Sequence, residues 1–548
     1  MKTLTLILAL LPFAASATPT VFTNANGYTS TNDGIVQFRS IVVGEDGRIL
    51  ETASDELAGN YTDAEVVDLN GATVLPGLTD AHAHLLGLGA LRTQLDLFGI
   101  DSLETAVDMI GDFARRNPGS GWVLGRGWNQ VLWESNEFPT AADIDAVVSE
   151  RPVWLRRVDG HAGWANSKAL ELAGIDNDTP DPIGGKIIRD ENGKATGTLI
   201  DKAMYMVTAQ VPPPTKAEIR SSYQAAFADV NSQGITGVHD AGIAKEHAEV
   251  LLSMADDKEI SIRFYGMISG AGDNLDAIGK PIVAYGDDHL DIRSVKLYQD
   301  GALGSRGAAM IQPYADDPEN RGLPFWTADE LYEKVAKADR MGFQVGIHAI
   351  GDKGNRMCLD AFEKVQGGEP SKHRHRIEHS QIVAVSDIER FAELGVVASM
   401  QPVHATSDMN MAEDRVGPDR IKGGYAWRKM LNNGVVIASG SDFPVELVNP
   451  FHGLYAAVSR QDRGGMPAGG WYPAEAMNRA EALHSFTLAA AFAAHQEDRL
   501  GSLEAGKWAD FIVVDRDYFE IDVSEIDDIQ VMQTWVAGEK VYDRDSIE

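Results

Sequence analysis

The sequence predicts an α/β fold: a (β/α)8 TIM-like barrel, a small β-sandwich domain formed from both chain termini, and an insertion after barrel strand one. Eight short apolar segments read as strands, and from residue 216 onward helical stretches separate them, which is typical of parallel βα units. Segments near both ends of the chain alternate apolar and polar residues around turn signals, which indicates a further β module. We expect a signal peptide over 1–17, the composite β-sandwich over 18–70 and 500–548, and the barrel over 71–499 with its insertion at about 100–215.

The first 17 residues, MKTLTLILALLPFAASA, have the pattern of a secretory signal peptide. Lys2 precedes an apolar run over 4–15, and the small residues Ala15 and Ala17 favour cleavage before Thr18. The run is shorter than the roughly 20 residues that a membrane anchor needs. No later segment is long and apolar enough to span a bilayer, so we expect a soluble periplasmic or secreted protein.

The net charge limits the possible binding partners, and the cysteine content limits how the fold can be stabilised. The chain of 548 residues carries 48 Lys and Arg against 81 Asp and Glu, a formal net charge of −33. Such a surface repels phosphate backbones, which argues against nucleic acid as a partner. The single cysteine, Cys358, excludes an intramolecular disulfide although export usually permits them. A large hydrophobic core must therefore stabilise the fold.

The β-sandwich is predicted from both ends of the chain. At the N-terminal end, residues 35–54 and 65–70 alternate around the turn signal EDG at 45–47. At the C-terminal end, residues 509–517 and 529–543 show the same pattern, with a turn at AGE. We expect these segments to pair as an antiparallel β domain.

The insertion carries its own signals. Residues 102–116 have helical periodicity, and 184–200 read as a hairpin. Five of the ten tryptophans lie here: Trp122, Trp128, Trp133, Trp154 and Trp164. They could form the core of an inserted domain or an apolar lid over a small-molecule pocket. A lid would favour substrates with an apolar or aromatic substituent on nitrogen.

The barrel strands are predicted at 73–84, 234–241, 260–269, 293–301, 342–350, 375–381, 395–402 and 434–442. Catalytic groups of such barrels gather at the carboxyl ends of the strands. Candidate metal-binding and catalytic side chains fall near these ends: His82, His84, Lys296, His348, His379 and Asp442. Residues with scattered structural roles would not all fall at the same end, so the pattern predicts one shared site.

The first two candidates are histidines one residue apart. In a strand His82 and His84 would point the same way, as would Asp80. The pair could ligate a metal or form a hydrogen-bonded part of the core. His373-x-His375 has the same spacing but follows polar residues 369–372 instead of an apolar strand. His239 and His404, near the ends of strands two and seven, could contact substrate or belong to the core, and neither enters the predicted metal set.

Several strings resemble the amidohydrolase superfamily, in particular its branch that includes N-substituted formamide deformylases. The strings are PGLTDAHAHL, DGHAGWANSKAL, VKLYQDGALGSRGAA, HAIGD, RIEHSQ, GSDFPV and GSLEAGKWADFIVVD, and they span nearly the whole mature chain. The resemblance implies a metal-dependent hydrolase that cleaves a C–N bond other than a peptide bond by attack of metal-activated water.

The resemblance also implies roles for the candidates. His82 and His84 would hold one Zn²⁺, and His348 with His379 a second, with one or two ions both possible. Asp442 would touch the metal and take the proton of the nucleophilic water. Lys296 would react with CO₂ to give a carbamate that bridges the ions; the alternative is a lysine paired with Asp300 or another acid. In the insertion, His161 would donate a hydrogen bond to the substrate carbonyl, or merely brace its loop.

The expected partner is a small amide or N-acyl amide, and the protein is expected to form a homodimer. Two other functions stay open. An ester or lactone could be cleaved by the same site, since water attacks a polarised carbonyl in these compounds as it does in an amide. A periplasmic binding protein without chemistry is also conceivable, although such a protein would be free to lose ligands, and all six candidates are present.

Overall fold

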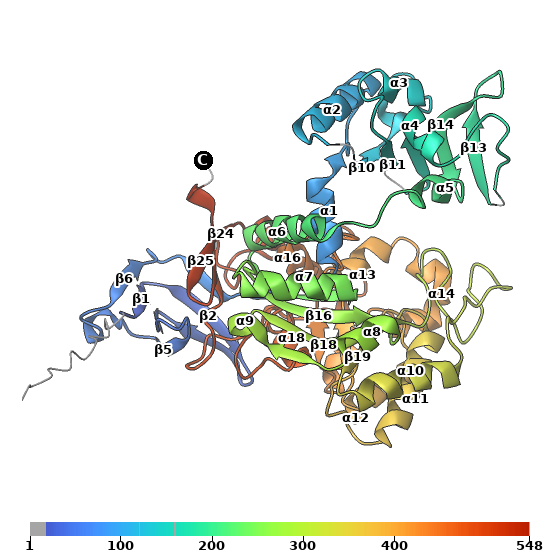
Figure 1. Ribbon diagram of the computed structural model, residues 1–548. Coiled ribbons are helices and arrows are strands. Elements are labelled where there is room, and N and C mark those ends of the chain that lie inside the picture. Colours follow the sequence, from blue (N-terminus) through green and yellow to red (C-terminus); the bar gives the residue numbers. More distant parts are fainter. Residues whose placement is uncertain (1–17, 120, 158–159, 183, 547–548) are drawn as a thin grey trace, which may run out of the picture. The chain divides into compact units, whose positions relative to one another are not determined.

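The computed structural model describes residues 18–119, 121–157, 160–182 and 184–546, and Figure 1 shows its elements. The predicted signal peptide, 1–17, lies outside the described residues. The chain forms two compact units: the first holds residues up to 83, 230–245 and 260–548, and the second holds 84–229 and 246–259. Within the described residues, no helix has the length and apolar character needed to cross a bilayer.

Eight parallel strands of the first unit confirm the predicted barrel. Each strand pairs in parallel with the next along the chain. β17 (Ile282–Ala284) adds an antiparallel pairing to β18. The barrel strands are β8 (Leu78–Ala83), β15 (Ile235–Ile243), β16 (Arg263–Ser269), β18 (Leu290–Tyr298), β19 (Gln344–Ala349), β20 (Arg376–His379), β21 (Val397–Met400) and β22 (Ile437–Ser439).

The last strand meets the first through the residues that follow β22. The backbone N–H of Asp442 donates to the carbonyl of His82 at 2.8 Å. The N–H and hydroxyl of Ser441 both donate to the buried carboxylate of Asp80, the hydroxyl at 2.6 Å. The closure of the barrel therefore fixes the loop that carries Asp442 against the strand that carries His82.

Helices follow the barrel strands, as the alternating pattern predicted. α10 begins with a capping box formed by Thr327 and Glu330, and α11 ends where Gly367 adopts a φ of +68°. The helices of this unit are α8 (Asp273–Ile278), α9 (Tyr285–Asp288), α10 (Ala328–Arg340), α11 (Asp352–Gln366), α12 (Ile388–Glu393), α13 (Pro402–Asp408), α14 (Ala412–Arg420), α15 (Trp427–Asn432), α16 (Pro450–Ser459), α17 (Arg479–Ser485) and α18 (Leu488–Ala493).

Both chain termini build the sandwich, in sheets of order β5-β4-β1-β6 and β25-β24-β23-β7-β2-β3. The pairing is not wholly antiparallel as expected, because β1–β6 and β2–β7 are parallel. Along the chain, strands β4 and β5 form a hairpin that comes after β1 and before β6. Strand β6 therefore runs beside β1 in the same direction. The bounds are β1 (Thr20–Thr23), β2 (Asn26–Thr31), β3 (Gly34–Phe38), β4 (Ser40–Val43), β5 (Ile49–Ala53), β6 (Glu65–Asp68), β7 (Thr73–Pro76), β23 (Phe511–Val514), β24 (Val531–Val536) and β25 (Glu539–Asp543).

The predicted first barrel strand, 73–84, is in fact two strands that serve two sheets. β7 pairs with β23 in the sandwich, and β8 pairs with β15 in the barrel. Gly77 separates them, and a Cβ at this position would lie 2.1 Å from the Oγ1 of Thr236. The apolar run is continuous because both strands are buried, so the sequence alone does not show the break.

The second unit has a six-stranded sheet of order β13-β14-β12-β11-β10-β9. The predicted helix and hairpin are confirmed as α2 and as the antiparallel pair β13–β14. The elements are α1 (Leu85–Thr93), β9 (Leu95–Asp96), α2 (Leu103–Arg116), β10 (Val123–Trp128), α3 (Ala141–Asp145), β11 (Val153–Arg157), β12 (Ala162–Ala165), α4 (Ser167–Leu172), β13 (Gly185–Arg189), β14 (Ala195–Asp201), α5 (Met204–Thr208), α6 (Lys216–Ser232) and α7 (Lys245–Asp256).

The tryptophans of the insertion build the cores of this unit. The buried rings of Trp128, Trp133 and Trp164 pack together with centroids 6.1 to 6.2 Å apart. Trp154 belongs to a second buried cluster, against which Trp122 packs. The interpretation that the insertion needs its own core is therefore confirmed, and the four buried rings are not available as the wall of a lid.

Candidate metal centre

Three predicted site residues meet at the carboxyl ends of the barrel strands. His82 comes from β8, His379 ends β20, and Asp442 follows β22. One ligand atom of each lies within 4.8 Å of the others, and all three side chains are buried. Two imidazole nitrogens and a carboxylate oxygen form a donor set suited to Zn²⁺.

The backbone at this cluster adopts rare conformations. His379, Ser380 and Asp442 have φ values of +75°, +42° and +66°, in the left-handed region that costs residues other than glycine about 1–3 kcal/mol. The surrounding bonds hold them there: the Ser380 hydroxyl donates to the carbonyl of Ile377 at 3.1 Å. Strain of this kind persists where the surrounding structure fixes it, and it is concentrated at functional sites.

A buried carboxylate orients His82. Its Nδ1 lies 2.5 Å from the Oε2 of Glu378, so the ring donates its Nδ1–H there and directs Nε2 toward the cluster. Nε2 lies 3.7 Å from the Oδ1 of Asp442. Burial raises the pKa of Glu378, but the charges of Arg376 and Lys296 and the hydrogen bonds with Arg376 and Ser399 together lower it by more, so the net shift is downward and the carboxylate stays charged.

Arg376 balances that charge. Its guanidinium, fully buried, donates to Glu378 at 2.6 and 3.1 Å, to the Ser399 hydroxyl at 2.7 Å and to the Ala81 carbonyl at 2.5 Å. A further N–H lies 2.9 Å from the Nδ1 of His239, which must therefore accept. Burial lowers the pKa of His239 well below its ordinary value. The structure thus places His239 as a neutral partner of Arg376.

His379 is held in the same way by an amide. Its Nδ1 lies 2.8 Å from the Oε1 of Gln401, the residue after β21, and this bond leaves Nε2 for the cluster. Burial lowers the pKa of His379 well below its ordinary value, with further lowering from His348 and His82. The ring is therefore neutral, the form in which imidazole binds a metal.

His348 and Lys296 lie beside this group. The His348 ring is 4.5 Å from that of His379, and burial, with Lys296 nearby, lowers its pKa to about 3. Its Nε2 is buried and has no hydrogen-bond partner among the described residues. This is the atom through which His348 would bind a metal. The Nζ of Lys296 lies 3.0 Å from the Nε2 of His82, and burial lowers the pKa of this lysine to about 8.

The alternative pairing of Lys296 with Asp300 is not formed. Asp300 instead accepts the backbone N–H groups of Ala309, Ile350 and Gly351, each at 2.9 Å. These bonds join the loop after β18 to the loop after β19. Asp300 therefore has a structural role, and the Lys296 amine faces the histidines.

Two predicted residues belong to the second unit. His84 is the residue before α1, with φ −132° and ψ 81°, and it begins that unit. His161 lies between β11 and β12 with its side chain 77% exposed, and its Nδ1 is 2.7 Å from Asp201. Their assigned roles, as a metal ligand and as a donor to the substrate carbonyl, stay predictions.

The comparison pair His373 and His375 lies apart from the cluster, just before β20. The Nε2 atoms of these rings are 3.8 and 3.3 Å from Asp339 of α10, and the Nδ1 of His375 accepts the N–H of Val345 at 3.1 Å. His-x-His spacing therefore does not by itself mark the site in this chain; the preceding apolar strand separates the two cases.

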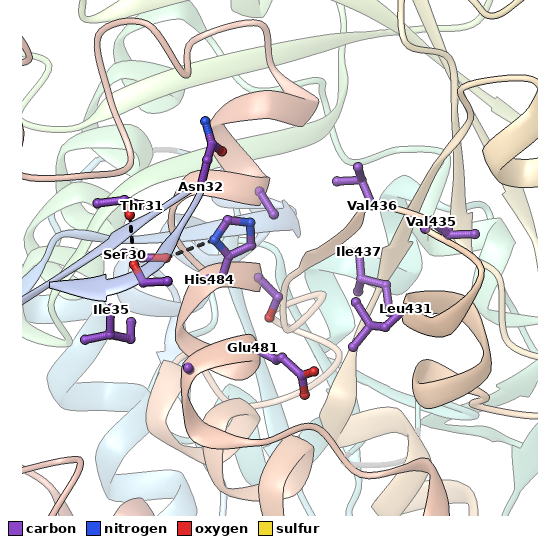
Figure 2. Close-up of a pocket in the computed structure, with 15 residues that line it drawn as sticks. Ser30, Thr31, Asn32, Ile35, Leu431, Val435, Val436, Ile437, Glu481 and His484 are labelled. Atoms are coloured by element: carbon purple, nitrogen blue, oxygen red, sulfur yellow. Dashed lines mark hydrogen bonds between the residues drawn. The ribbon is translucent and has the colours of Figure 1, made fainter.

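A cavity of about 360 Å³ lies where the sandwich meets the barrel (Figure 2). The hairpin β2–β3, α17 and the start of β22 line it. Its lining is mainly apolar, and its most prominent polar contact joins Ser30 to the Nδ1 of His484 at 2.9 Å. Asp442 follows the opposite end of β22, so this cavity is separate from the metal cluster.

Reasoning from the sequence missed three residues of the site, Arg376, Glu378 and Gln401, and left open whether His404 contacts substrate or belongs to the core. Arg376 and Glu378 are opposite charges two apart in an apolar strand, a spacing that puts both on one buried face and requires them to pair. That signal was present in RIEHSQ. Gln401 and His404 follow strand seven directly, but nothing in their spacing points to the histidine they adjoin.

Comparison with known proteins places this site in a family. The model of the Amidohydrolase family matches residues 65–542. The chain is 36% identical to the protein LONG AFTER FAR-RED 3 of Arabidopsis thaliana over 94% of this chain and 91% of that protein. It is 29% identical to an N-substituted formamide deformylase of Arthrobacter pascens, over 90% and 93% of the two chains.

A solved structure agrees with these sequence matches. An uncharacterized metal-dependent hydrolase from Pyrococcus furiosus superposes with a TM-score of 0.77 at 28% identity, covering 92% of this chain and all of the other. The match extends over barrel, sandwich and insertion alike. With its metal-suited His/His/Asp group at the carboxyl ends of a parallel barrel, the chain belongs to the amidohydrolase family of metal-dependent hydrolases.

Proposed function

We propose that this protein is an exported metal-dependent amidohydrolase that cleaves the C–N bond of a non-peptide or N-acyl amide. The observation that carries the proposal is the buried group of His82, His379 and Asp442, in which partner residues turn both imidazole Nε2 atoms inward. The similarity to an N-substituted formamide deformylase supports an amide as substrate.

The donor set fits a divalent cation, with Zn²⁺ as the proposed ion. His82, His379 and Asp442 would hold it, and His348, His84 and Lys296 are the further ligands proposed if two ions bind. When bound, such an ion polarises the substrate carbonyl and lowers the pKa of water. Asp442 would accept the proton of the attacking water and pass it to the leaving nitrogen, which breaks the C–N bond.

Lys296 is proposed to carry a carbamate. Only the neutral amine reacts with CO₂, and the low pKa of about 8 that burial gives Lys296 makes this form accessible. The carbamate is an anion, and it would replace a positive charge that is unfavourable beside a cation. A crystal structure of the metal-loaded enzyme tests this: electron density for a bare amine at Lys296 would exclude the carbamate.

Substrates with an apolar substituent on nitrogen are favoured by the side chains at the carboxyl ends of β18 and β22. Tyr298 is 40% exposed, and its ring lies 5.5 Å from that of His348. Phe325, 52% exposed, is tied to the residue after Tyr298 by its N–H bond to Gln299. Val445, 69% exposed, forms a turn with Asp442. Apolar surface therefore flanks the cluster from two strands.

An ester or lactone is the second candidate substrate class, because the same groups would act on any polarised carbonyl. A non-catalytic binding protein is the third possibility, and the inward Nε2 atoms argue against it, since binding alone does not require them. Periplasmic location, a homodimer and the role of His161 stay predictions from the sequence.

The test is a substrate panel on metal-defined protein. Purified enzyme is analysed for bound metal, stripped with a chelator and reconstituted with Zn²⁺. It is then assayed with N-alkylformamides of increasing chain length, N-acyl amino acids, dipeptides and lactones. We expect metal-dependent amide hydrolysis whose kcat/KM rises with chain length. Protein that binds metal but hydrolyses no amide would reject the proposal.

A further inference from the structure

His404 is a histidine at the cluster to which no role has been assigned. It lies on α13, directly after β21, and its ring stacks on that of His379 with centroids 5.8 Å apart and planes 20° apart. Its Nε2 is 3.9 Å from the Oδ2 of Asp442, which is beyond hydrogen-bond distance. His404 therefore adjoins both the metal group and the proposed proton acceptor.

The Nε2 of His404 is buried and makes no hydrogen bond to any residue that the structure describes. Its neighbours are already committed: the Nδ1 of His379 donates to Gln401, and that of His82 donates to Glu378. A buried ring nitrogen without a protein partner is unfavourable unless something else bonds to it. The space between this atom and Asp442 is where a polar atom of the substrate can supply that bond.

The helix that carries His404 is fixed on two sides. Asp408 accepts from the Gln381 amide at 2.6 Å and from the Tyr425 hydroxyl at 2.7 Å, and Gln381 lies two residues after His379. Ser407 donates to Glu446, four residues after Asp442, at 2.6 Å. The segments after β20 and β22, two of the three strands that supply metal-binding residues, thus also position α13, as a preorganised catalytic donor requires.

The neighbouring carboxylate favours one tautomer of the ring. A negative charge 3.9 Å from Nε2 stabilises a hydrogen on that nitrogen more than on Nδ1. In this tautomer His404 presents an N–H donor next to the group that accepts the proton of the water. An amide substrate has an acceptor that needs such a donor, the carbonyl oxygen.

We infer that His404 is a catalytic residue that donates a hydrogen bond from Nε2 to the substrate oxygen as it becomes an oxyanion; this inference rests on the proposed amide hydrolysis. The water oxygen bonds to the carbonyl carbon, its proton goes to Asp442, and the C=O π pair moves onto the oxygen held by His404. The electron pair on this oxygen then re-forms the C=O bond as the C–N bond breaks. The leaving nitrogen takes the proton from Asp442.

Two variants separate hydrogen bonding from shape. His404→Leu keeps much of the volume and removes the donor, whereas the amide nitrogen of His404→Gln reaches about the position of Nε2. We expect the leucine variant to lose about 100-fold or more in kcat with KM changed less than about threefold. We expect the glutamine variant to recover at least tenfold of that loss. The affinity for a phosphonamidate analogue, which mimics the tetrahedral oxyanion, should fall with kcat/KM.

Controls make each outcome decisive. His373→Leu changes a histidine of similar exposure at the other end of the barrel, and it should leave kcat unchanged. Metal content should stay at the wild-type value in all three variants. Loss of metal in both His404 variants, or equal kcat in the leucine and glutamine variants, would overturn the inference. If the metal-loaded wild-type protein hydrolyses no amide, both the proposed function and this inference fail. If the wild-type protein is active and His404→Leu is equally active, only this inference is rejected.

Discussion

The buried ion pair beneath His82 decides which ring nitrogen faces the cluster. Glu378 accepts the Nδ1–H of His82 at 2.5 Å and is itself bound by Arg376. Without that carboxylate the ring could turn or change tautomer, and the metal would lose a correctly placed Nε2. The residue that fixes a ligand in this way contributes to metal affinity without touching the metal.

We therefore expect Glu378→Gln to weaken metal binding by about 10- to 100-fold, because an amide accepts the Nδ1–H less strongly and cannot pair ionically with Arg376. Competition with a chromophoric chelator measures the Kd for Zn²⁺ directly. Glu363→Gln, at an exposed side chain of α11, is the matched control and should bind metal like wild type. Equal affinity in both variants would show that Glu378 does not support His82.

Lys296 makes the stability of the metal-free protein depend on pH. Burial lowers its pKa from 10.5 to about 8, so between these values the unfolded chain binds more protons than the folded one. Stability then rises with pH across this window, and below pH 8 the full cost of the buried ammonium, about 3 kcal/mol, is present. Lys296→Met removes this dependence.

Urea unfolding in CO₂-free buffer with a chelator tests this. The unfolding free energy of wild type minus that of Lys296→Met should rise by up to about 3 kcal/mol from pH 7.5 to pH 10.5. Parallel curves for the two proteins would mean that the folded pKa of Lys296 is not lowered.

At the scale of elements, the hairpin β2–β3 is joined to α17 by the bond between Ser30 and His484 beside the 360 Å³ cavity (Figure 2). Ser30 is buried, and burial lowers the pKa of His484, so the ring is neutral. We expect Ser30→Ala to cost about 1 kcal/mol, the usual value for a neutral hydrogen bond. The cavity lets water replace the hydroxyl, so the cost should not exceed about 2 kcal/mol.

A double-mutant cycle with Ser30→Ala and His484→Leu isolates this contact. The coupling energy from thermal unfolding should be about 0.5–1.5 kcal/mol. A coupling near zero would show that the hairpin is held by its apolar contacts alone.

The sequence predicted elements best where one physical signal dominated. The eight barrel strands are short apolar runs between helices, and each run matches a strand within a few residues. The sheet of the insertion was missed except for its hairpin, since β9 and β12 are short and their respective partners β10 and β14 lie across long connections. The division of 73–84 was also missed, because both halves are buried and give the same apolar pattern.

At the scale of the molecule, the sequence could place ligands at strand ends but not the groups that orient them. His82, His379 and Asp442 follow from the rule that carboxyl ends meet at one face of a parallel barrel. The partners Glu378, Gln401 and His404 depend on side-chain directions across three strands. Those directions come from register and from the left-handed backbone at His379, neither of which the sequence pattern encodes.

β7 of the sandwich and β8 of the barrel are separated by a single residue, Gly77. Its N–H donates to Asp510 of the sandwich, and the place of its missing side chain is filled by Thr236 of β15. A Cβ there would lie 2.1 Å from Oγ1 and 2.5 Å from Cγ2 of Thr236, so a side chain must displace one strand. His82 lies five residues further along β8, which links this junction to the metal group.

Gly77→Ala should therefore lower the unfolding free energy by about 1–3 kcal/mol through overpacking and should also weaken Zn²⁺ binding. Adding Thr236→Ala removes both of the closest atoms but leaves the Cβ of residue 236 at 2.8 Å, so it should restore part of the stability and metal affinity that Gly77→Ala loses. Thr236→Ala alone gives the fourth corner of the cycle. Urea unfolding and chelator competition on the four proteins measure both effects. If Gly77→Ala were tolerated without loss, or if Thr236→Ala failed to rescue it, the close approach of β15 would not be what requires glycine at this junction.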